Sequence, residues 1–281
     1  MSNNNNRNQR AKAAQQTLEV LEHGRYTLPD GVKVDVSEAL ANCVENTVLV
    51  KPEDELAYGT EATFDTAFIV KNQTTIQACL EHLNGEPLVC LNFASARNPG
   101  GGFLGGSQAQ EESLARASGL YKSQMRHMEM YEANREQRSL LYLDYMIYSP
   151  AVPFFKDESD KLLTQPYQVS VITAPAPNRG AISANQPERL PEVPETMDRR
   201  IKRVLALALK YGYQQIVLGA WGCGVFRNDP AMVAESFYKQ LTNGGEFEGK
   251  FKKVIFGVLD RTKGTVFPEF EKRFANNESQ H

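Results

Sequence analysis

Four short and almost uninterrupted apolar runs are the feature that most constrains how this chain can fold. They are PLVCLNFAS (87–95), QVSVITAPA (168–176), QQIVLGA (214–220) and KKVIFGVL (252–259). A run of this length without polar alternation is typical of a strand that is buried on both faces of its sheet. Helix-patterned segments separate the runs, and the clearest of them, 194–211, places its apolar residues along one stripe. The alternation predicts an α/β fold built in layers.

Weaker patterns complete this prediction. We expect helices over 8–22, 37–46, 74–83 and 230–241, a short strand over 68–70, and a turn at TLPDG (27–31). Residues 1–7 are polar and are expected to form a disordered tail. No linker follows the first sixty residues, so we expect 8–60 to be a helical accessory region attached to a core over 61–274. Residues 275–281 would then be a C-terminal tail.

Composition and charge exclude several classes of protein. The 281 residues carry a formal net charge of only -3, so no global basic field indicates sequence-specific nucleic-acid binding. No apolar run approaches the roughly 18 residues of a membrane span, and the polar N-terminus lacks the apolar stretch of a secretory signal. The cysteines, Cys43, Cys79, Cys90 and Cys223, show no metal-ligand spacing. Free thiols suit a reducing compartment, so we expect a cytoplasmic protein, or a nuclear one in a eukaryote, without a bound metal.

The most informative stretch for function is NFASARNPGGGFLGGSQAQEESLARASGLY, residues 92–121. Five glycines fall within seven positions, 100–106, and they let the backbone approach a ligand closely, with successive amides lining a site for an anion or a ribose. Ser107 and Gln110 have the spacing of a helix capping box. That spacing predicts that Glu111 and Glu112 stand near the start of a helix running to about residue 120. Because neighbours on a helix differ by about 100°, the two carboxylates should face different ways.

Each part of this stretch also has an ordinary structural interpretation. Acidic residues are common in a first helical turn because they complement the helix dipole, and glycine-rich segments also occur in flexible linkers. The combination in order favours a site instead: a buried strand, Asn-Pro-Gly-Gly-Gly, a spacer, Gln-Glu-Glu and a helix. Loops at the carboxyl ends of parallel strands are where α/β sheets bind ligands.

A second glycine loop, GAWGCGVFRND (219–229), lies between a predicted strand and a predicted helix. It is interpreted either as a phosphate-binding loop or as an ordinary strand-to-helix turn. Cys223 is not favoured as a nucleophile, because no motif supplies the base that a catalytic thiol needs. The single tryptophan, Trp221, is expected to pack in the interior. The segment 175–194 is too long for an inert connection and is a further candidate loop of the site.

The order GGG, seven residues, then QEE is similar to the signature of microbial-type poly(ADP-ribose) glycohydrolases, which are catalytic macrodomains. The resemblance extends over most of the chain, through TLEVLEHGRYTLPDG, YSPAVPFF (148–155), ITAPAPN (172–178) and LGAWGCGVFRNDP (218–230). It implies a three-layer α/β/α macrodomain with a mixed central sheet and an N-terminal helical extension. Residues 1–7 and 275–281 fall outside it.

The resemblance also implies roles for single residues. Glu112 would be the catalytic acid/base, Glu111 would position the ribose, and Asn98 would hydrogen-bond ribose hydroxyls. The second glycine loop would hold the pyrophosphate, with Phe226 packing beside the distal ribose. The residues expected to bind substrate are Asn98, Gly100, Gly101, Gly102, Gln110, Gly222, Cys223, Gly224, Val225 and Phe226. Asp65 and Asn178 are candidates for contacts with adenine.

The activity that the resemblance implies is hydrolysis of the ribose–ribose O-glycosidic bonds of poly(ADP-ribose), with release of ADP-ribose and without a cofactor. The partners would be the polymer or ADP-ribosylated macromolecules. Three alternatives stay open: a macrodomain that binds ADP-ribose without cleaving it, a hydrolase of mono-ADP-ribosyl groups on protein or nucleic acid, and a structural or toxin-neutralising protein. A module that only binds ADP-ribose has no use for two adjacent carboxylates, which speaks against the first.

Overall fold

The computed structural model describes residues 2–59, 61, 63–261 and 264–274, with side chains from Asn5 onward. Over these residues the chain forms two compact units. The first unit is drawn from the described residues within 1–50, 92–136 and 145–174, and the second from those within 51–91, 137–144 and 175–274. The C-terminal tail expected over 275–281 lies outside the described residues. The division at residue 60 into an accessory region and a core stays a prediction, although residues up to Val50 group with the glycine-rich loop.

The strands of the first unit are antiparallel. They are β3 (Val48–Val50), β6 (Met146–Lys156) and β7 (Leu162–Ala174), with a separate hairpin of β1 (Arg25–Thr27) and β2 (Lys33–Asp35). β6 pairs with β3 on one side and with β7 on the other. The TLPDG turn predicted from the sequence joins the two strands of the hairpin. The hairpin contacts β6 through one cluster of buried apolar residues, in which Tyr26 packs against Phe155.

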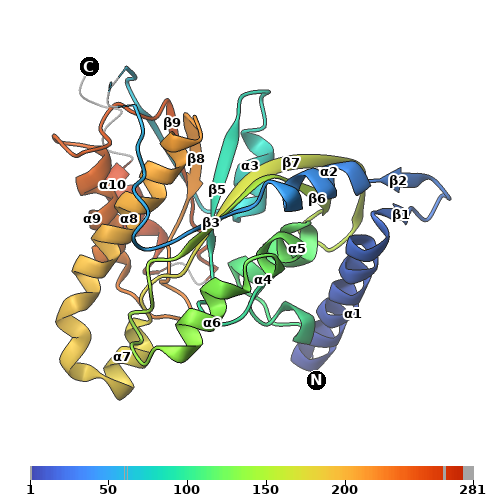
Figure 1. Ribbon diagram of the computed structural model, residues 1–281, viewed down its shortest axis with the longest axis horizontal. Helices are drawn as coiled ribbons and strands as arrows, with labels where there is room; N and C mark the ends of the chain where they lie inside the picture. The colour runs from blue at the N-terminus through green and yellow to red at the C-terminus, as the bar shows by residue number, and fades with distance from the viewer. Residues whose placement is uncertain (1, 60, 62, 262–263, 275–281) are drawn as a thin grey trace. The chain divides into compact units, whose positions relative to one another are not determined.

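Helices of the first unit follow in the order α1 (Ser2–His23), α2 (Ser37–Glu45), α4 (Gln110–Ala117), α5 (Leu120–Met125) and α6 (Met128–Glu136). A short 3-10 helix, η1 (Phe103–Gly105), lies inside the glycine-rich loop and contacts α1. Figure 1 shows α1 in dark blue leading into the hairpin, and α4, α5 and α6 in succession in green.

The strands of the second unit are parallel. They are β4 (Ala67–Lys71), most of β5 (Leu88–Phe93), β8 (Gln215–Leu218) and β9 (Lys253–Gly257). The hydrogen-bonded order of the central strands is β3-β6-β7-β5-β8-β9-β4, and β5 runs from the second unit into the first at Asn92. This sheet contains both antiparallel and parallel strand pairs, so it is a mixed sheet. The arrangement confirms the α/β class predicted from the sequence.

The helices of the second unit are α3 (Thr75–Glu81), α7 (Arg179–Asn185), α8 (Val193–Lys210), α9 (Pro230–Leu241) and α10 (Phe267–Phe274), with a 3-10 helix η2 (Pro187–Glu192) before α8. The apolar stripe predicted for α8 is confirmed, since Met197, Ile201 and Val204 are fully buried. Asp229 caps α9 by accepting a hydrogen bond from the Ala231 amide, and Pro230 occupies the first helical position. α8 and α10 both pack against α9.

Some local predictions were wrong. The helix predicted to begin at residue 8 begins at Ser2, so residues 2–7, which were expected to be part of a disordered tail, are helical. Ser107 and Gln110 form no capping box: α4 begins at Gln110, its N-cap is Ala109, and no side chain caps it. The predicted helix to residue 120 is broken, because Ser118 is in an extended conformation between α4 and α5.

The long segment 175–194 also differs from an open loop, since it forms α7 and η2. Its first helix is capped by Asn178, whose side chain accepts a hydrogen bond from the Ala181 amide. This hydrogen bond caps the start of α7. The segment is therefore mostly helical, where the sequence indicated a loop.

Candidate active site

The glycine-rich loop leaves β5 at Ala94 and enters α4 at Gln110. Two backbone hydrogen bonds fold its centre, from the Gly101 amide to the Asn98 carbonyl (3.0 Å) and from the Phe103 amide to the Gly100 carbonyl (3.2 Å). The Phe103 ring anchors the loop, because it is fully buried and lies 4.9 Å from the Tyr121 ring between centroids. The loop is therefore a folded structure and not a flexible linker.

Gly101 is the position at which the loop most needs a glycine. Its φ is +60°, and a Cβ built there would lie 2.5 Å from Glu112 Oε1 and 3.2 Å from Glu111 Oε2. Both carboxyl groups thus reach the same glycine from the first turn of α4. The predicted divergence of the two side chains holds in part: Glu111 is buried and Glu112 is half-buried, but their carboxyl groups stay close to each other.

Glu111 is held in the interior by three N–H donors. Its Oε2 accepts from the Ser95 amide (2.6 Å), and its Oε1 accepts from the side-chain amides of Gln124 (3.0 Å) and Asn92 (3.2 Å). Burial raises the pKa of Glu111 to about 8, and this effect outweighs the hydrogen bonds, which lower it. The folded protein therefore keeps Glu111 mainly protonated at neutral pH.

Glu112 faces the bend of the loop. Its Oε1 accepts a hydrogen bond of 3.0 Å from the Gly102 amide. A single backbone donor fixes the direction of the carboxyl group and leaves further lone pairs available. Gly102 is exposed and Glu112 is half-buried, so this carboxyl group is more open to a ligand than that of Glu111.

The other residues predicted in this loop lie around the two glutamates. Gln110 Oε1 accepts a hydrogen bond from the Phe93 amide (2.8 Å), which ties the start of α4 to the end of β5. Asn98 is exposed, and its backbone amide donates to Ser95 Oγ (3.1 Å). The structure thus brings Asn98, Gly100–Gly102 and the QEE motif together in one loop of the first unit.

The second glycine loop belongs to the second unit. Gly222 has a φ of +74°, and a Cβ there would lie 2.4 Å from Asn228 Nδ2 and 2.7 Å from the Ala176 Cβ. Asn228 Nδ2 donates to the Pro177 carbonyl (2.9 Å). The loop is therefore built against the segment that follows β7, where the sequence analysis expected a site loop. The rest of it is open, since a Cβ at Gly224 would meet nothing within 4 Å and Val225 is 77% exposed.

Phe226 and Cys223 of this loop differ in their surroundings. The Phe226 ring lies 6.0 Å from the Tyr142 ring, and the Phe226 carbonyl accepts from the Gly180 amide (2.8 Å). Burial raises the pKa of the Cys223 thiol to about 12, which agrees with the inference that it is no nucleophile. Trp221 is fully buried, as expected.

The two adenine candidates are placed differently. Asn178 Nδ2 donates to the Tyr142 hydroxyl (3.3 Å), so its side chain already serves α7 and Tyr142. Asp65 is exposed just before β4. Their assignment to adenine stays a prediction.

Sequence reasoning missed the side chains that hold Glu111. Asn92 and Gln124 are fully buried and polar. A signal for Asn92 was present, because an asparagine inside the apolar run LVCLNF needs a hydrogen-bond partner once it is buried. No comparable signal marked Gln124 on α5, which is far from the motif in sequence.

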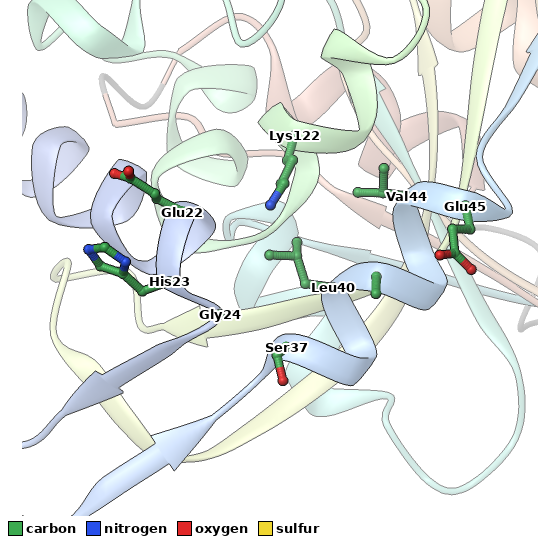
Figure 2. Close-up of a pocket in the computed structure, with 9 residues that line it drawn as sticks. Glu22, His23, Gly24, Ser37, Leu40, Val44, Glu45 and Lys122 are labelled. Carbon is green, nitrogen blue, oxygen red and sulfur yellow. The ribbon is translucent and has the colours of Figure 1, made fainter.

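A surface hollow of the first unit lies apart from these residues. It has a volume of about 240 Å³ and lies between the end of α1 and α2. Figure 2 shows Glu22, Leu40 and Lys122 among its lining residues. Lys122 Nζ donates to the Leu21 carbonyl (2.6 Å). No residue predicted for the site lines the hollow.

A cluster of metal ligands and a membrane-spanning helix are both absent from the described part of the chain. No group of three or more His, Cys, Asp or Glu side chains there is arranged to hold a metal ion. Within the same ranges no helix combines the length and apolar character needed to cross a membrane.

A family model described as microbial-type PARG, catalytic domain, matches residues 14–157 of this sequence, just over half of its length. The chain belongs to the microbial-type poly(ADP-ribose) glycohydrolase family. None of the curated proteins matches it significantly.

Similar solved structures support this family assignment. The poly(ADP-ribose) glycohydrolase of Thermomonospora curvata, bound to the inhibitor ADP-HPD, is 44% identical, with a TM-score of 0.86 over 96% of this chain and 99% of that chain. The enzyme from Deinococcus radiodurans in complex with ADP-ribose is also 44% identical, with a TM-score of 0.79 over 84% of this chain and 97% of that chain. The predicted macrodomain fold is confirmed, and the chain is a poly(ADP-ribose) glycohydrolase.

Proposed function

We propose that the chain releases ADP-ribose from poly(ADP-ribose) with Glu112 as the acid/base. The observation that carries this proposal is the place of Glu112 Oε1, which accepts from the Gly102 amide and lies against Gly101, where no side chain fits. The loop thereby presents a fixed, half-buried carboxyl group beside bare backbone, which a sugar can approach closely.

In the proposed reaction, Glu112 in its acid form donates a proton to the oxygen that joins the two riboses. The bond between that oxygen and the anomeric carbon then breaks. The carboxylate takes a proton from a water molecule as the water oxygen bonds to the anomeric carbon, which restores the acid. One water molecule is consumed. The products are ADP-ribose with an anomeric hydroxyl and a polymer that ends in the freed ribose hydroxyl.

We assign Glu111 a different task from Glu112. Burial and three N–H donors fix its carboxyl group, and a pKa raised to about 8 keeps it neutral near pH 7. A neutral carboxyl group can donate a hydrogen bond, as other enzymes use buried carboxylic acids. Glu111 would thus orient a ribose hydroxyl while the change of protonation during the reaction stays on Glu112.

We assign substrate binding to the two glycine loops. Structures of relatives hold ADP-ribose or ADP-HPD, which supports ADP-ribose as the group bound here. In the first loop, Asn98 and Gly100–Gly102 would contact ribose. In the second, the backbone of 222–226 would contact the pyrophosphate, because Gly224 is open and the loop precedes the N-terminus of α9. The described cysteines are free thiols, which supports a cytoplasmic location.

The activity is tested by incubating the chain with labelled poly(ADP-ribose) and, separately, with a mono-ADP-ribosylated protein. We expect free ADP-ribose from the polymer. Release only from the mono-modified protein would favour the mono-ADP-ribosyl hydrolase, with Glu112 in the same chemical role. Tight binding of ADP-ribose without any release would favour a binding module. Neither binding nor cleavage would favour a structural protein.

A further inference from the structure

The N-terminal helix grips the glycine-rich loop through two arginines. Arg7 Nε donates to the Gly105 carbonyl (2.9 Å), and Arg10 Nε donates to the Gly106 carbonyl (2.8 Å). The backbones also meet, since a Cβ on Gly106, whose φ is +74°, would lie 2.1 Å from the Arg7 carbonyl oxygen. Gly106 therefore admits the backbone of α1 at this point.

α1 is itself anchored one to two turns further on. The ammonium group of Lys156, a fully buried side chain on β6, donates to the Ala13 carbonyl (2.6 Å) and to Thr17 Oγ1 (2.9 Å). The side chains of Ala14 and Phe103 pack in one cluster and both are fully buried. These contacts hold α1 against β6 and η1, and they fix the position in which the first turns of α1 meet the loop.

The carbonyl groups of Gly105 and Gly106 belong to a turn that is hydrogen-bonded to the Glu112 side chain. The Gly102 carbonyl accepts from the amides of Gly105 (3.1 Å) and Ser107 (3.2 Å), which closes a turn over 102–107. The first residue of that turn, Gly102, donates its amide to Glu112 Oε1 (3.0 Å). A displacement of 105–106 therefore moves the donor that directs this carboxyl group.

We propose that Arg7 and Arg10 are positioning residues, which hold the turn over 102–107 and through it the direction of the Glu112 carboxyl group. The inference rests on the proposed role of Glu112. Both arginines precede residue 14, where the match to the family model begins. Arg10 should contribute more than Arg7, because it is partly buried and Arg7 is exposed.

The test uses the full chain with Arg7→Ala, Arg10→Ala, the double variant, Arg10→Lys and the control Lys12→Ala. Lys12 is exposed on the same helix, so its removal takes away one positive charge without touching the loop. We expect kcat of the double variant to fall at least about tenfold, short of the roughly 100-fold that a misplacement of 1 Å can cost. KM and the Kd for ADP-ribose should stay within about twofold, since uniform binding is not affected. Lys12→Ala should equal the parent, and Arg10→Lys should recover most of kcat, because its ammonium group can donate to the same carbonyl.

Several outcomes would overturn the inference. An unchanged kcat in a folded double variant would do so, and so would an equal loss in Lys12→Ala. A loss of kcat that only follows the folded fraction, measured by melting, would show a purely structural role. If the double variant does not fold, kcat of Arg10→Ala is compared with kcat of Arg10→Lys. A lower kcat in folded Arg10→Ala supports the inference, and equal values at the level of the parent overturn it. Glu112→Gln measured in parallel separates the two proposals: its full activity would refute the role of Glu112, whereas its inactivity beside a fully active double variant would refute only the role of the arginines.

Discussion

At the scale of single residues, Gly101 links the two carboxyl groups of the site. Gly101→Ala places a Cβ 2.5 Å from Glu112 Oε1 at a φ of +60°, so it must displace the carboxyl group and strain the loop. We expect turnover to fall by about tenfold or more, because the acid/base leaves its productive direction. Steady-state kinetics on poly(ADP-ribose) measure the effect.

Gly224→Ala is the matched control for the fold. A Cβ at Gly224 meets nothing within 4 Å, so the unliganded protein should melt like the parent. If the second loop binds the pyrophosphate, the Kd for ADP-ribose should rise while the melting temperature without ligand stays the same. Normal affinity in the Gly224→Ala and Gly224→Val variants would remove this loop from the binding site, and normal turnover in Gly101→Ala would contradict the role of the first.

The buried carboxyl group of Glu111 makes stability depend on pH. Its pKa rises from 4.5 to about 8 on folding, so between these values the unfolded chain has lost a proton that the folded chain keeps. The stabilisation from this group is complete below about pH 4 and is lost as the pH rises through 8, with a slope of up to about 1.4 kcal/mol per pH unit. Glu111→Gln should flatten this dependence in urea unfolding at pH 5, 6, 7 and 8. Parallel curves for the parent and the variant would show that Glu111 is ionised in the folded state.

Residue identities in the motif were predictable, but the environment of each residue was not. The QEE motif and the glycines before it are contiguous in sequence, so spacing alone nominated Glu111 and Glu112. Which of the two is buried depends on Asn92 and Gln124, which reach Glu111 from β5 and α5. Contacts of this kind depend on tertiary packing, and no local pattern encodes them.

At the scale of elements, Arg200 joins α8 to the segments around it. Its guanidinium donates to Asp144 Oδ1 (2.7 Å) and to the carbonyls of Leu141 (2.6 Å) and Pro175 (3.0 Å). Arg200→Met removes these donors from buried acceptors and should cost about 3 kcal/mol of unfolding free energy. Arg199 also pairs with Asp144, but its side chain is 49% exposed, so Arg199→Met should cost at most about 1 kcal/mol. Urea unfolding compares them, and equal losses would contradict this role of Arg200.

Elements with a strong local pattern were predicted well, and those without one were missed. The apolar stripe of α8 and the continuous runs of β5, β8 and β9 carry their own signal. β6 (Met146–Lys156) was missed as a strand, because two prolines interrupt it and a register shift between Ser149 and Val152 breaks its pairing with β7. The capping box failed because Gln110 uses its side chain to bind the end of β5, a contact between elements that short-range spacing does not reveal.

At the scale of the whole molecule, ADP-ribose should stabilise the folded chain by mass action. A ligand that binds only the folded state at 100 times its Kd contributes about 2.7 kcal/mol. We therefore expect the melting temperature to rise steadily with ADP-ribose concentration, as measured by scanning fluorimetry. An unchanged melting temperature at millimolar ADP-ribose would contradict the proposed ligand.

The fold class of the whole chain was predictable from the alternation of apolar runs and helical segments, and the family from one motif with its spacing. The division into compact units was not. β5 passes from one unit to the other at Asn92, and the first unit collects three stretches that are not contiguous in sequence. Such a division follows from which strands pair, and strand pairing over long separations leaves little trace in a single sequence.

The most direct test of the account is the turnover of poly(ADP-ribose) by Glu112→Gln, measured beside its affinity for ADP-ribose. Glutamine keeps the volume of the side chain and an acceptor for the Gly102 amide, but it cannot exchange a proton near neutral pH. We predict that turnover falls by about two orders of magnitude or more, that the Kd for ADP-ribose changes little, and that Glu111→Gln loses less. Turnover by Glu112→Gln equal to that of the parent would contradict the assignment of Glu112 as the acid/base.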